Sequence, residues 1–179
     1  MARLASQAKL GYYPTPNEIV GILKSMLDFE PDTRILDPCC GDGEALANIA
    51  AGRAETWGIE LEKNRFLAAQ QRLDNVLHAD ALREITYQGP AAFDCLFLNP
   101  PYGFELLRLE MLFIRKYIRY LCPKGLLIGI FPESAFRVYD FRKTLAVLKG
   151  LEIRAFPPSL FWEFRQYVVF VIFRPILVQ

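Results

Sequence analysis

The sequence has little of several features that mark whole classes of protein. It holds one histidine, His78, in 179 residues, and a single imidazole leaves no histidine-based metal site or catalytic triad. No pair among its four cysteines has CxxC or zinc-ligand spacing, so we expect reduced thiols in a cytoplasmic protein. No apolar run is long and charge-free enough to span a membrane, and the N-terminus lacks a signal-peptide pattern. We therefore expect neither a bound metal nor a membrane partner.

An excess of charge of either sign is also missing. The 21 lysines and arginines nearly balance the 20 aspartates and glutamates, for a net charge of +1. A freestanding DNA-binding protein is usually more basic, because phosphate contacts supply most of its affinity. The balance therefore counts against tight DNA binding by this chain alone. Basic residues recur on two expected helices, where a solvated helix face is the simpler interpretation: Arg108, Arg115, Lys116 and Arg119 on one, and Arg137, Arg142 and Lys143 on the other.

Apolar residues, in contrast, make up 53% of the chain, which is typical of a buried parallel sheet. Short apolar runs predict strands, and segments of helical pattern lie between them. The expected strands cover residues 34–37, 56–60, 75–78, 93–98, 126–131, 152–156 and 167–173. The expected helices begin near residues 16 and 44 and cover 63–73, 105–121 and 134–148. This alternation predicts a single α/β domain over residues 1–179, with a seven-stranded, mostly parallel sheet, helices on both faces and a C-terminal antiparallel hairpin.

The first expected helix has a clear start signal. The hydroxyl of Thr15 suits the N-cap position, Pro16 suits the first helical position, and Glu18 completes a capping box. The apolar stripe that follows is more typical of a core than of a partner surface. We therefore expect a capped helix that packs against the sheet.

Asn99-Pro100-Pro101-Tyr102 is the most informative motif in the chain. It follows the apolar run 93–98, and α/β folds bind ligands at the carboxyl ends of their strands. The Asn99 side-chain oxygen and the Pro100 carbonyl can both accept hydrogen bonds from an NH2 group. Pro101 keeps Pro100 extended, because the residue before a proline avoids helical backbone angles. Tyr102 offers a flat face for a base, so the motif is suited to holding a planar amine for methyl transfer.

A glycine-rich turn and three acids point to a cofactor site. The turn, residues 37–43, reads Asp-Pro-Cys-Cys-Gly-Asp-Gly, and its glycines allow tight curvature and close approach of the backbone to a ligand. Its spacing is neither the dinucleotide GxGxxG nor a P-loop. Asp37 ends the first strand, and Glu60 ends the second, where a carboxylate can accept hydrogen bonds from ribose hydroxyls. Asp80 follows the third strand, placed to meet an adenine amine. No basic cluster accompanies the turn, which fits a cofactor that has no phosphates and carries a positive sulfonium.

Taken in order along the whole chain, these segments resemble the class I S-adenosylmethionine (SAM)-dependent methyltransferases, and within them the N6-adenine-specific DNA methyltransferases of NPPY type. Segment 12–16, Tyr-Tyr-Pro-Thr-Pro, is similar to the one that these enzymes place against the methionine end of SAM, and segment 131–134 resembles the exit of their fifth strand. The resemblance implies a Rossmann-like fold and SAM as cofactor, with the turn at its methionine part, Glu60 at the ribose and Asp80 at the adenine. The residues expected to bind SAM are Tyr13, Thr15, Asp37, Pro38, Cys39, Gly41, Gly43, Glu60, Leu61, Asp80, Ala81 and Asn99.

The resemblance also implies the reaction, in which a methyl group passes from SAM to the exocyclic N6 amine of adenine in DNA. The catalytic residues expected on this basis are Asn99, Pro100, Pro101 and Tyr102. The target base would leave the duplex and stack on Tyr102, with a second stacking group from Phe161, Trp162 or Phe164. The family's DNA enzymes usually carry a target-recognition domain after the catalytic domain, and this sequence stops after the last expected strand. The expected partners are therefore DNA and a separate recognition domain or subunit.

Three alternatives remain open at the level of sequence. An RNA methyltransferase acting on the amino group of an exposed adenine or guanine would use the same residues, although segment 12–16 and Asp37-Pro38 favour DNA. A glutamine methyltransferase acting on a protein also carries the tetrapeptide, but it usually has an N-terminal helical domain for which this chain has no room. A SAM-binding accessory subunit without its own activity would be free to lose Asn99, which is present.

Overall fold

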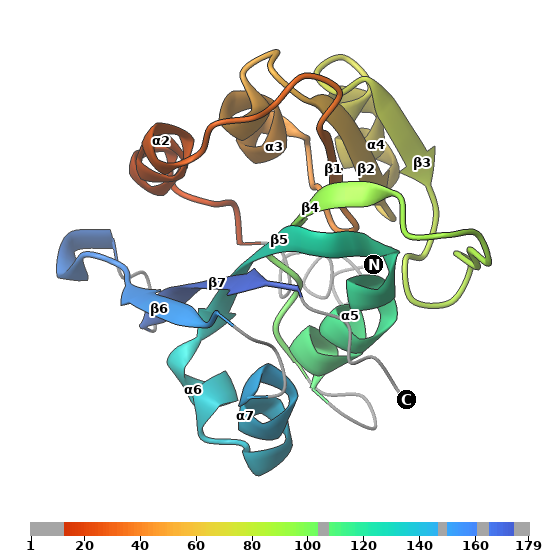
Figure 1. Ribbon diagram of the computed structural model, residues 1–179. Coiled ribbons are helices and arrows are strands. Elements are labelled where there is room, and N and C mark those ends of the chain that lie inside the picture. Colours follow the sequence, from red (N-terminus) through yellow and green to blue (C-terminus); the bar gives the residue numbers. More distant parts are fainter. Residues whose placement is uncertain (1–12, 104–107, 147–149, 161–164, 174–179) are drawn as a thin grey trace, which may run out of the picture.

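The computed structural model describes residues 13–103, 108–146, 150–160 and 165–173. Within these ranges the chain forms a seven-stranded sheet with helices on both faces (Figure 1). The strands are β1 (Arg34–Asp37), β2 (Glu55–Glu60), β3 (Asn75–His78), β4 (Phe93–Leu98), β5 (Leu121–Pro132), β6 (Glu152–Ala155) and β7 (Gln166–Ile172). Their order across the sheet is β3-β2-β1-β4-β5-β7-β6, which confirms the predicted fold class.

The end of the sheet that is made by the C-terminal strands is antiparallel. Strands β1 to β5 pair in parallel, whereas β7 runs antiparallel to β5 from the pair Leu126–Ile172 to the pair Pro132–Gln166. Strand β6 pairs with β7, also antiparallel, as the predicted terminal hairpin requires. Because β7 inserts between β5 and β6, its first residue lies beside the carboxyl end of β5.

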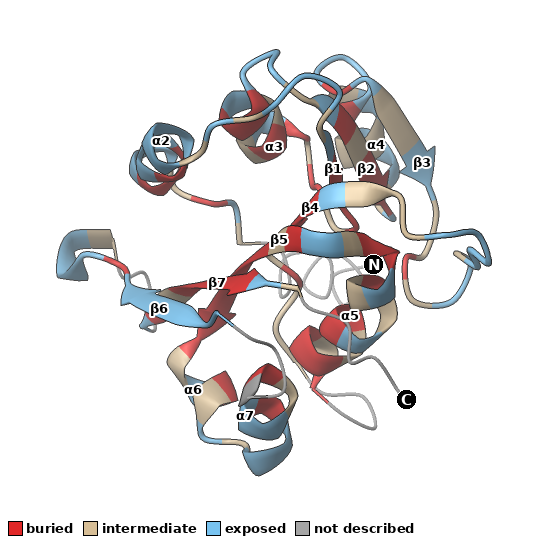
Figure 2. Ribbon diagram, viewed as in Figure 1, coloured by how far each residue is buried: buried red, intermediate tan, exposed pale blue. Residues whose placement is uncertain are grey.

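Helices cover the two faces of the sheet in separate groups. Helices α2 (Asn17–Met26), α3 (Glu44–Ala50) and α4 (Lys63–Ala69) pack on one face, and α5 (Leu109–Tyr117), α6 (Glu133–Phe136) and α7 (Tyr139–Ala146) on the other. The sides of α3 and α5 that face the sheet are buried, as Figure 2 shows. None of the helices in the described ranges is long and apolar enough to cross a membrane.

Two apolar cores follow from the alternation of side chains along the strands. In β1, Ile35 faces the core under α2 and α3, and Leu36 faces the core under α5. In β4, Phe97 and Leu98 divide in the same way. Successive residues of a strand point to opposite faces, so a central strand covered on both sides must be apolar throughout. This is why the apolar runs in the sequence identify the central strands.

Thr15 is not the N-cap of the first helix, contrary to the prediction. Pro16 occupies the N-cap position of α2, and no side chain makes a capping hydrogen bond there. Thr15 Oγ1 instead accepts a hydrogen bond from Asn99 Nδ2 at 3.1 Å. The Thr15 hydroxyl thus bonds to a residue that is distant in the sequence and not to the first turn of α2. The capping box expected with Glu18 does not form.

Other element boundaries also differ from the prediction, and the helix expected over 63–73 ends at Ala69. The fifth strand, expected from residue 126, begins at Leu121 and contains a bulge, because Phe93 pairs with Leu121 whereas Cys95 pairs with Leu126. Lys124, which lies within this bulge, has a φ of 70°. The single helix expected over 134–148 is interrupted after Phe136, and α7 begins only at Tyr139. Of the helix expected over 105–121, residues 105–107 lie outside the described ranges.

Candidate active site

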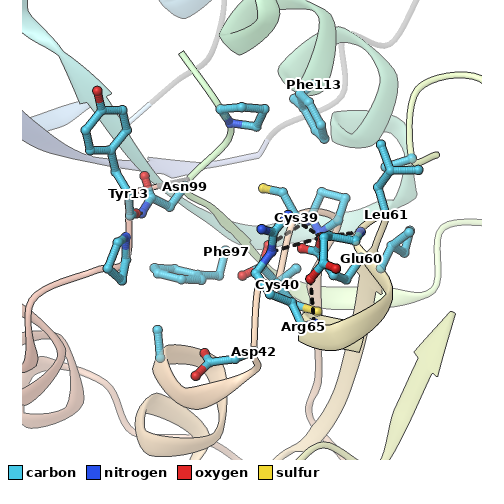
Figure 3. A pocket seen from close by; sticks show the side chains of 18 of the residues that line it. Tyr13, Cys39, Cys40, Asp42, Glu60, Leu61, Arg65, Phe97, Asn99 and Phe113 are labelled. Carbon is cyan, nitrogen blue, oxygen red and sulfur yellow. Dashed lines mark hydrogen bonds and ion pairs between the residues drawn. The ribbon is translucent and has the colours of Figure 1, made fainter. Parts of the chain in front are cut away.

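A cavity of about 1020 Å³ opens at the carboxyl ends of β1, β2 and β4. This edge is where the strand order reverses, since β2 and β3 lie to one side of β1 and β4 lies to the other. Open α/β sheets bind ligands at such a switch point. Tyr13 and Asn99 lie at one end of the cavity and Leu61 and Glu60 at the other (Figure 3).

Most of the predicted site residues meet in this cavity. Those that line it are Tyr13, Thr15, Asp37, Pro38, Cys39, Glu60, Leu61, Asp80, Ala81, Asn99 and Pro101. Four others, Gly41, Gly43, Pro100 and Tyr102, are not among the lining residues. The cavity therefore brings together the turn, the three acids and the proline-rich tetrapeptide, as the sequence predicts.

The glycine-rich turn is folded tightly back over β2. Gly41 has a φ of 59° and Gly43 a φ of 80°, backbone angles that side-chain-bearing residues rarely adopt. The Gly41 amide donates to Glu60 Oε2 at 3.1 Å, which ties the turn to the tip of β2. A Cβ on Gly58 in β2 would lie 2.6 Å from Cys40 Sγ. The turn can pass this close to the sheet only because position 58 has no side chain.

Asp37 is a buried carboxyl at the base of the cavity. Burial raises its pKa to about 7, against a hydrogen bond from the Cys39 amide that lowers it, and the nearby Glu60 raises it further. The Cys39 amide donates to Asp37 Oδ1 at 2.9 Å. A group with this pKa is about half ionised near neutral pH. A positive charge placed in the cavity would therefore favour the ionised form.

Glu60 is held in place by Arg65, a residue that the sequence analysis did not single out. Glu60 Oε1 accepts from Arg65 Nη2 at 2.8 Å, from Arg65 Nε at 3.1 Å and from the Glu62 amide at 2.7 Å. Oε2 takes the Gly41 amide and keeps room for a second donor such as a ribose hydroxyl. The position of Arg65 in the first turn of α4, five residues after the acid, is a weak signal that could have suggested this pair.

The loop after β3 forms the far end of the cavity. Asp80 Oδ1 accepts from the amides of Leu82 and Arg83 at 2.9 and 3.1 Å, and Oδ2 lies 3.3 Å from Arg83 Nη1. Leu61, Leu82 and Phe113 add apolar surface beside this carboxylate. An acid next to apolar side chains suits a flat heterocycle that carries an amino group.

Asn99 lies at the opposite end, where the N-terminal segment crosses the end of β4. Its Nδ2 donates to the Tyr13 carbonyl at 2.8 Å and to Thr15 Oγ1 at 3.1 Å. Its Oδ1 accepts from the Tyr102 hydroxyl at 3.1 Å. A backbone carbonyl can only accept, so the amide nitrogen must face Tyr13 and the oxygen must face away from it. The side chain is thus fixed in one orientation.

Tyr102 has a different environment from the one the sequence suggested. Its ring stacks on that of Tyr13, with centroids 5.5 Å apart and planes 17° apart, and its hydroxyl accepts from Gln166 Nε2 at 2.8 Å. Burial raises the pKa of its phenol well above the usual value, so the hydroxyl keeps its proton. Stacking of a base on Tyr102 stays a prediction. The other expected stacking residues, Phe161, Trp162 and Phe164, lie outside the described ranges.

A buried ion pair lies at the start of α5 and is hydrogen-bonded to α6. Arg108 Nη2 donates to Glu110 Oε1 at 2.8 Å, and Arg108 Nε donates to Oε2 at 3.3 Å. Arg108 Nη2 also reaches Ser134 Oγ at 3.2 Å. Glu110 is fully buried, with an exposed fraction of 0%. Sequence reasoning placed Arg108 on a solvated helix face; it is instead buried before α5 and fixes this helix against α6.

The donor set of the cavity fits S-adenosylmethionine. Three carboxylates stand at successive strand ends, and the volume is at the upper limit for small-molecule sites. The fold and this cavity define a class I SAM-dependent methyltransferase. The chain belongs to an uncharacterised methyltransferase family (DUF6094), whose model matches residues 1–175. S-adenosylmethionine is its cofactor, as the sequence predicts.

Similar proteins agree with this class. Over 114 residues the chain is 32% identical to the type I restriction enzyme MjaVII methylase subunit of Methanocaldococcus jannaschii. The match covers 55% of this chain and 20% of that protein. A putative class I SAM-dependent methyltransferase from Listeria monocytogenes superposes with a TM-score of 0.78 at 22% identity, covering 92% of this chain and 62% of that one. The methyltransferase subunit of a type I restriction-modification system from Streptococcus thermophilus gives a TM-score of 0.76 at 17% identity, covering 93% and 45%. The chain thus spans only part of each of these proteins, a fifth of the first.

Proposed function

We propose that this chain transfers a methyl group from S-adenosylmethionine to the exocyclic N6 amine of adenine in DNA, as a single catalytic domain over residues 1–179. The class of enzyme follows from the fold and the family. The nature of the acceptor is inferred from the arrangement of hydrogen bonds at Asn99.

The observation that carries the proposal is the pattern of used and unused hydrogen-bonding positions on Asn99. The two amide hydrogens are directed to the Tyr13 carbonyl and to Thr15 Oγ1, and one lone pair of Oδ1 takes the Tyr102 hydroxyl. Within the described residues, the second lone pair of Oδ1 is the position left over. That position accepts a hydrogen bond and cannot donate one. The site is therefore suited to a substrate that brings a donor, such as an NH2 group.

The same acceptor favours the transfer itself. The lone pair of an aromatic amine is delocalised into its ring, so the nitrogen is a poor nucleophile. A hydrogen bond from the amine to Asn99 Oδ1 favours a more tetrahedral nitrogen, whose lone pair can point at an electrophilic carbon. As positive charge develops on that nitrogen, the acceptor binds it more strongly, which stabilises the transition state. Bound SAM supplies the electrophilic methyl group. The Pro100 carbonyl, from the residue after Asn99, is the second acceptor that we expect.

DNA is the favoured substrate for two reasons. The motif order along the chain resembles that of DNA amino-methyltransferases, and the curated relative with 32% identity is the methylase subunit of a type I restriction enzyme. With a net charge of +1, the chain has few cations to spare for phosphate contacts. We therefore include a separate target-recognition domain or subunit in the proposal.

Methyl transfer from isotope-labelled SAM tests the proposal. Unmethylated duplex DNA and, in a second reaction, unmodified RNA are incubated with the chain, and the hydrolysed nucleosides are separated. We expect labelled N6-methyladenine from DNA. The Asn99→Ala variant should bind SAM with a similar Kd and transfer at least about 100-fold more slowly, the scale on which one transition-state hydrogen bond acts.

Each other outcome points to one of the alternatives. Label in RNA but not in DNA would identify an RNA base methyltransferase. Transfer by Asn99→Ala at the wild-type rate would overturn the role of Asn99. Binding of SAM without transfer to either nucleic acid would show that this chain needs a partner, or acts as an accessory subunit.

A further inference from the structure

Gln166 is a buried polar residue close to the cavity. No motif in the sequence assigns a role to it. It is the first residue of β7 and pairs with Pro132 at the carboxyl end of β5. Only 6% of its surface is exposed. Its Nε2 lies 2.8 Å from the Tyr102 hydroxyl oxygen, so a side chain of β7 contacts the last residue of the tetrapeptide.

A series of hydrogen bonds leads from Gln166 through Tyr102 and Asn99 to the carbonyl of Tyr13. In each bond the residue nearer to Gln166 is the donor. The Tyr13 carbonyl can only accept, so Asn99 donates to it through Nδ2 at 2.8 Å. Asn99 Oδ1 therefore faces Tyr102 and accepts from its hydroxyl at 3.1 Å. A phenol has one proton, and once this proton is directed at Asn99 the phenol oxygen can only accept. Gln166 Nε2 supplies the donor that it needs.

This direction would reverse if position 166 presented an acceptor. The Tyr102 proton would then turn toward residue 166, and Asn99 Oδ1 would lose its partner. With that lone pair unpaired, the amide of Asn99 would be held only through Nδ2. Tyr102 itself is buried and keeps its proton, since burial raises the pKa of its phenol. Which group donates in each of these hydrogen bonds therefore depends on the residue at position 166.

We propose that Gln166 is a positioning residue for methyl transfer: by donating to the Tyr102 hydroxyl, it commits the Tyr102 proton to Asn99 Oδ1 and so fixes the free lone pair of Asn99 toward the substrate amine. The inference rests on the proposed role of Asn99. It gives Tyr102 a hydrogen-bonding function that is separate from base stacking.

Two variants of similar size separate this role from simple packing. Gln166→Glu keeps the shape but replaces the donor by an acceptor, whereas Gln166→Met keeps the volume and removes all hydrogen bonding. In Gln166→Met the Tyr102 proton still has Asn99 as its acceptor. We expect kcat to fall by about 100-fold or more in Gln166→Glu and by less than about 10-fold in Gln166→Met, with KM and the Kd for SAM little changed in both.

The coupling runs through one hydroxyl, so its removal provides the control. In a Tyr102→Phe background, Gln166→Glu and Gln166→Met should differ in kcat by less than about 3-fold, because residue 166 no longer has a proton to direct. Equal losses from Gln166→Glu and Gln166→Met in the presence of Tyr102 would overturn the proposal, since they would show that Gln166 only fills space.

A spectroscopic readout keeps the test independent of the substrate. The side-chain NH2 resonances of Asn99 in ¹⁵N-labelled protein, assigned by their loss in Asn99→Asp, report the hydrogen bonding of that amide. We expect them to shift in Gln166→Glu and in Tyr102→Phe and to stay near their wild-type positions in Gln166→Met. If wild-type protein methylates no nucleic acid, the proposed function fails, and this readout still decides the inference. If Gln166→Glu does not fold, unchanged Asn99 resonances in Tyr102→Phe would overturn it.

Discussion

At the scale of single residues, the orientation of Asn99 depends on groups that lie far away in the sequence. The Tyr13 carbonyl and the Thr15 hydroxyl precede it by 86 and 84 positions, and both accept from its amide. A side chain that must present one lone pair in a set direction loses rate when a single anchor is lost. The residues that hold Asn99 are therefore expected to matter for kcat as well as for stability.

Thr15 gives the first prediction at this scale. Thr15→Val removes the hydroxyl that accepts from Asn99 Nδ2 and keeps the shape, whereas Thr15→Ser keeps the hydroxyl. Loss of one neutral hydrogen bond costs about 1 kcal/mol, so we expect Thr15→Val to lower kcat by about 5-fold to 10-fold and Thr15→Ser to stay near wild type. Steady-state kinetics on the methylated substrate provide the measurement, and equal rates for Val and Ser would contradict it.

Asp37 gives a prediction about pH. Its pKa is raised from 3.8 to about 7, so between pH 6 and 7.5 the carboxyl passes from mostly neutral to mostly ionised. The ionised form attracts the positive charges of SAM, and we expect the affinity to rise with pH over this interval by up to about eightfold. Isothermal titration calorimetry measures the change. The Asp37→Asn variant has no such group, and a pH dependence that survived in it would exclude Asp37 as the cause.

The Asp37 carboxyl has the opposite effect on the stability of the cofactor-free protein, which we expect to fall as pH rises. The folded state holds the Asp37 proton up to about pH 7, whereas the unfolded chain loses it near 3.8. The contribution of Asp37 to the free energy of unfolding is therefore full below about pH 4 and declines as pH rises toward 7. SAM should offset this decline, so the stabilisation by SAM in thermal melts should be larger at pH 7.5 than at pH 6.

At the scale of helices and strands, the sequence predicts the central strands better than the helices. β1 and β4 have the bounds that their apolar runs indicate, because both faces of these strands are covered. The edge strand β3 also has its predicted bounds, although Leu77 is exposed. Helix ends depend on contacts that are distant in the sequence. Thr15 does not cap the first helix, because its hydroxyl accepts a hydrogen bond from Asn99. The helix expected after β5 is interrupted after Phe136.

Some residues of the candidate site were predicted from the sequence and others were not. Asp37, Glu60 and Asp80 were predicted, because the end of a strand in an α/β fold is a known place for a ligand. Arg65 and Gln166 were not, since neither belongs to a motif and their contacts exist only in the folded chain. Gln166 lies 64 positions from Tyr102, and no local pattern indicates that the two meet.

The buried ion pair of Arg108 and Glu110 at the start of α5 gives a prediction at this scale. Arg108→Met removes the cation beside the fully buried Glu110 carboxylate, a change that costs about 3–5 kcal/mol in comparable pairs. The double variant Arg108→Met with Glu110→Leu removes both charges and should recover most of that loss. Urea unfolding measures both. A double variant as unstable as Arg108→Met would show that the pair itself, and not the buried carboxylate left by the single substitution, decides the stability.

At the scale of the whole molecule, the small net charge would limit the affinity of the chain for DNA, its proposed substrate. With a net charge of +1, we expect non-specific binding with a Kd of about 10⁻⁴–10⁻⁶ M at physiological salt, weakening steeply as salt rises. Fluorescence anisotropy with two unrelated duplexes, at low and moderate salt, measures this. The two affinities should agree within about 3-fold. A preference for one duplex of about 1,000-fold would show that the chain carries its own sequence recognition.

The insertion of β7 between β5 and β6 also has a consequence for the order in which the protein is completed during synthesis. The strands and the turn that form the cavity leave the ribosome first, whereas β7 is the last of the described strands to be made and the one that covers the apolar edge of β5. A nascent chain that ends before Gln166 exposes that edge, a surface prone to pairing with other chains. It also lacks the residue that begins the row of hydrogen bonds to Asn99. An incomplete translation product would thus hold most of the residues that we expect to bind SAM but lack the residue that we propose as the positioning group for methyl transfer.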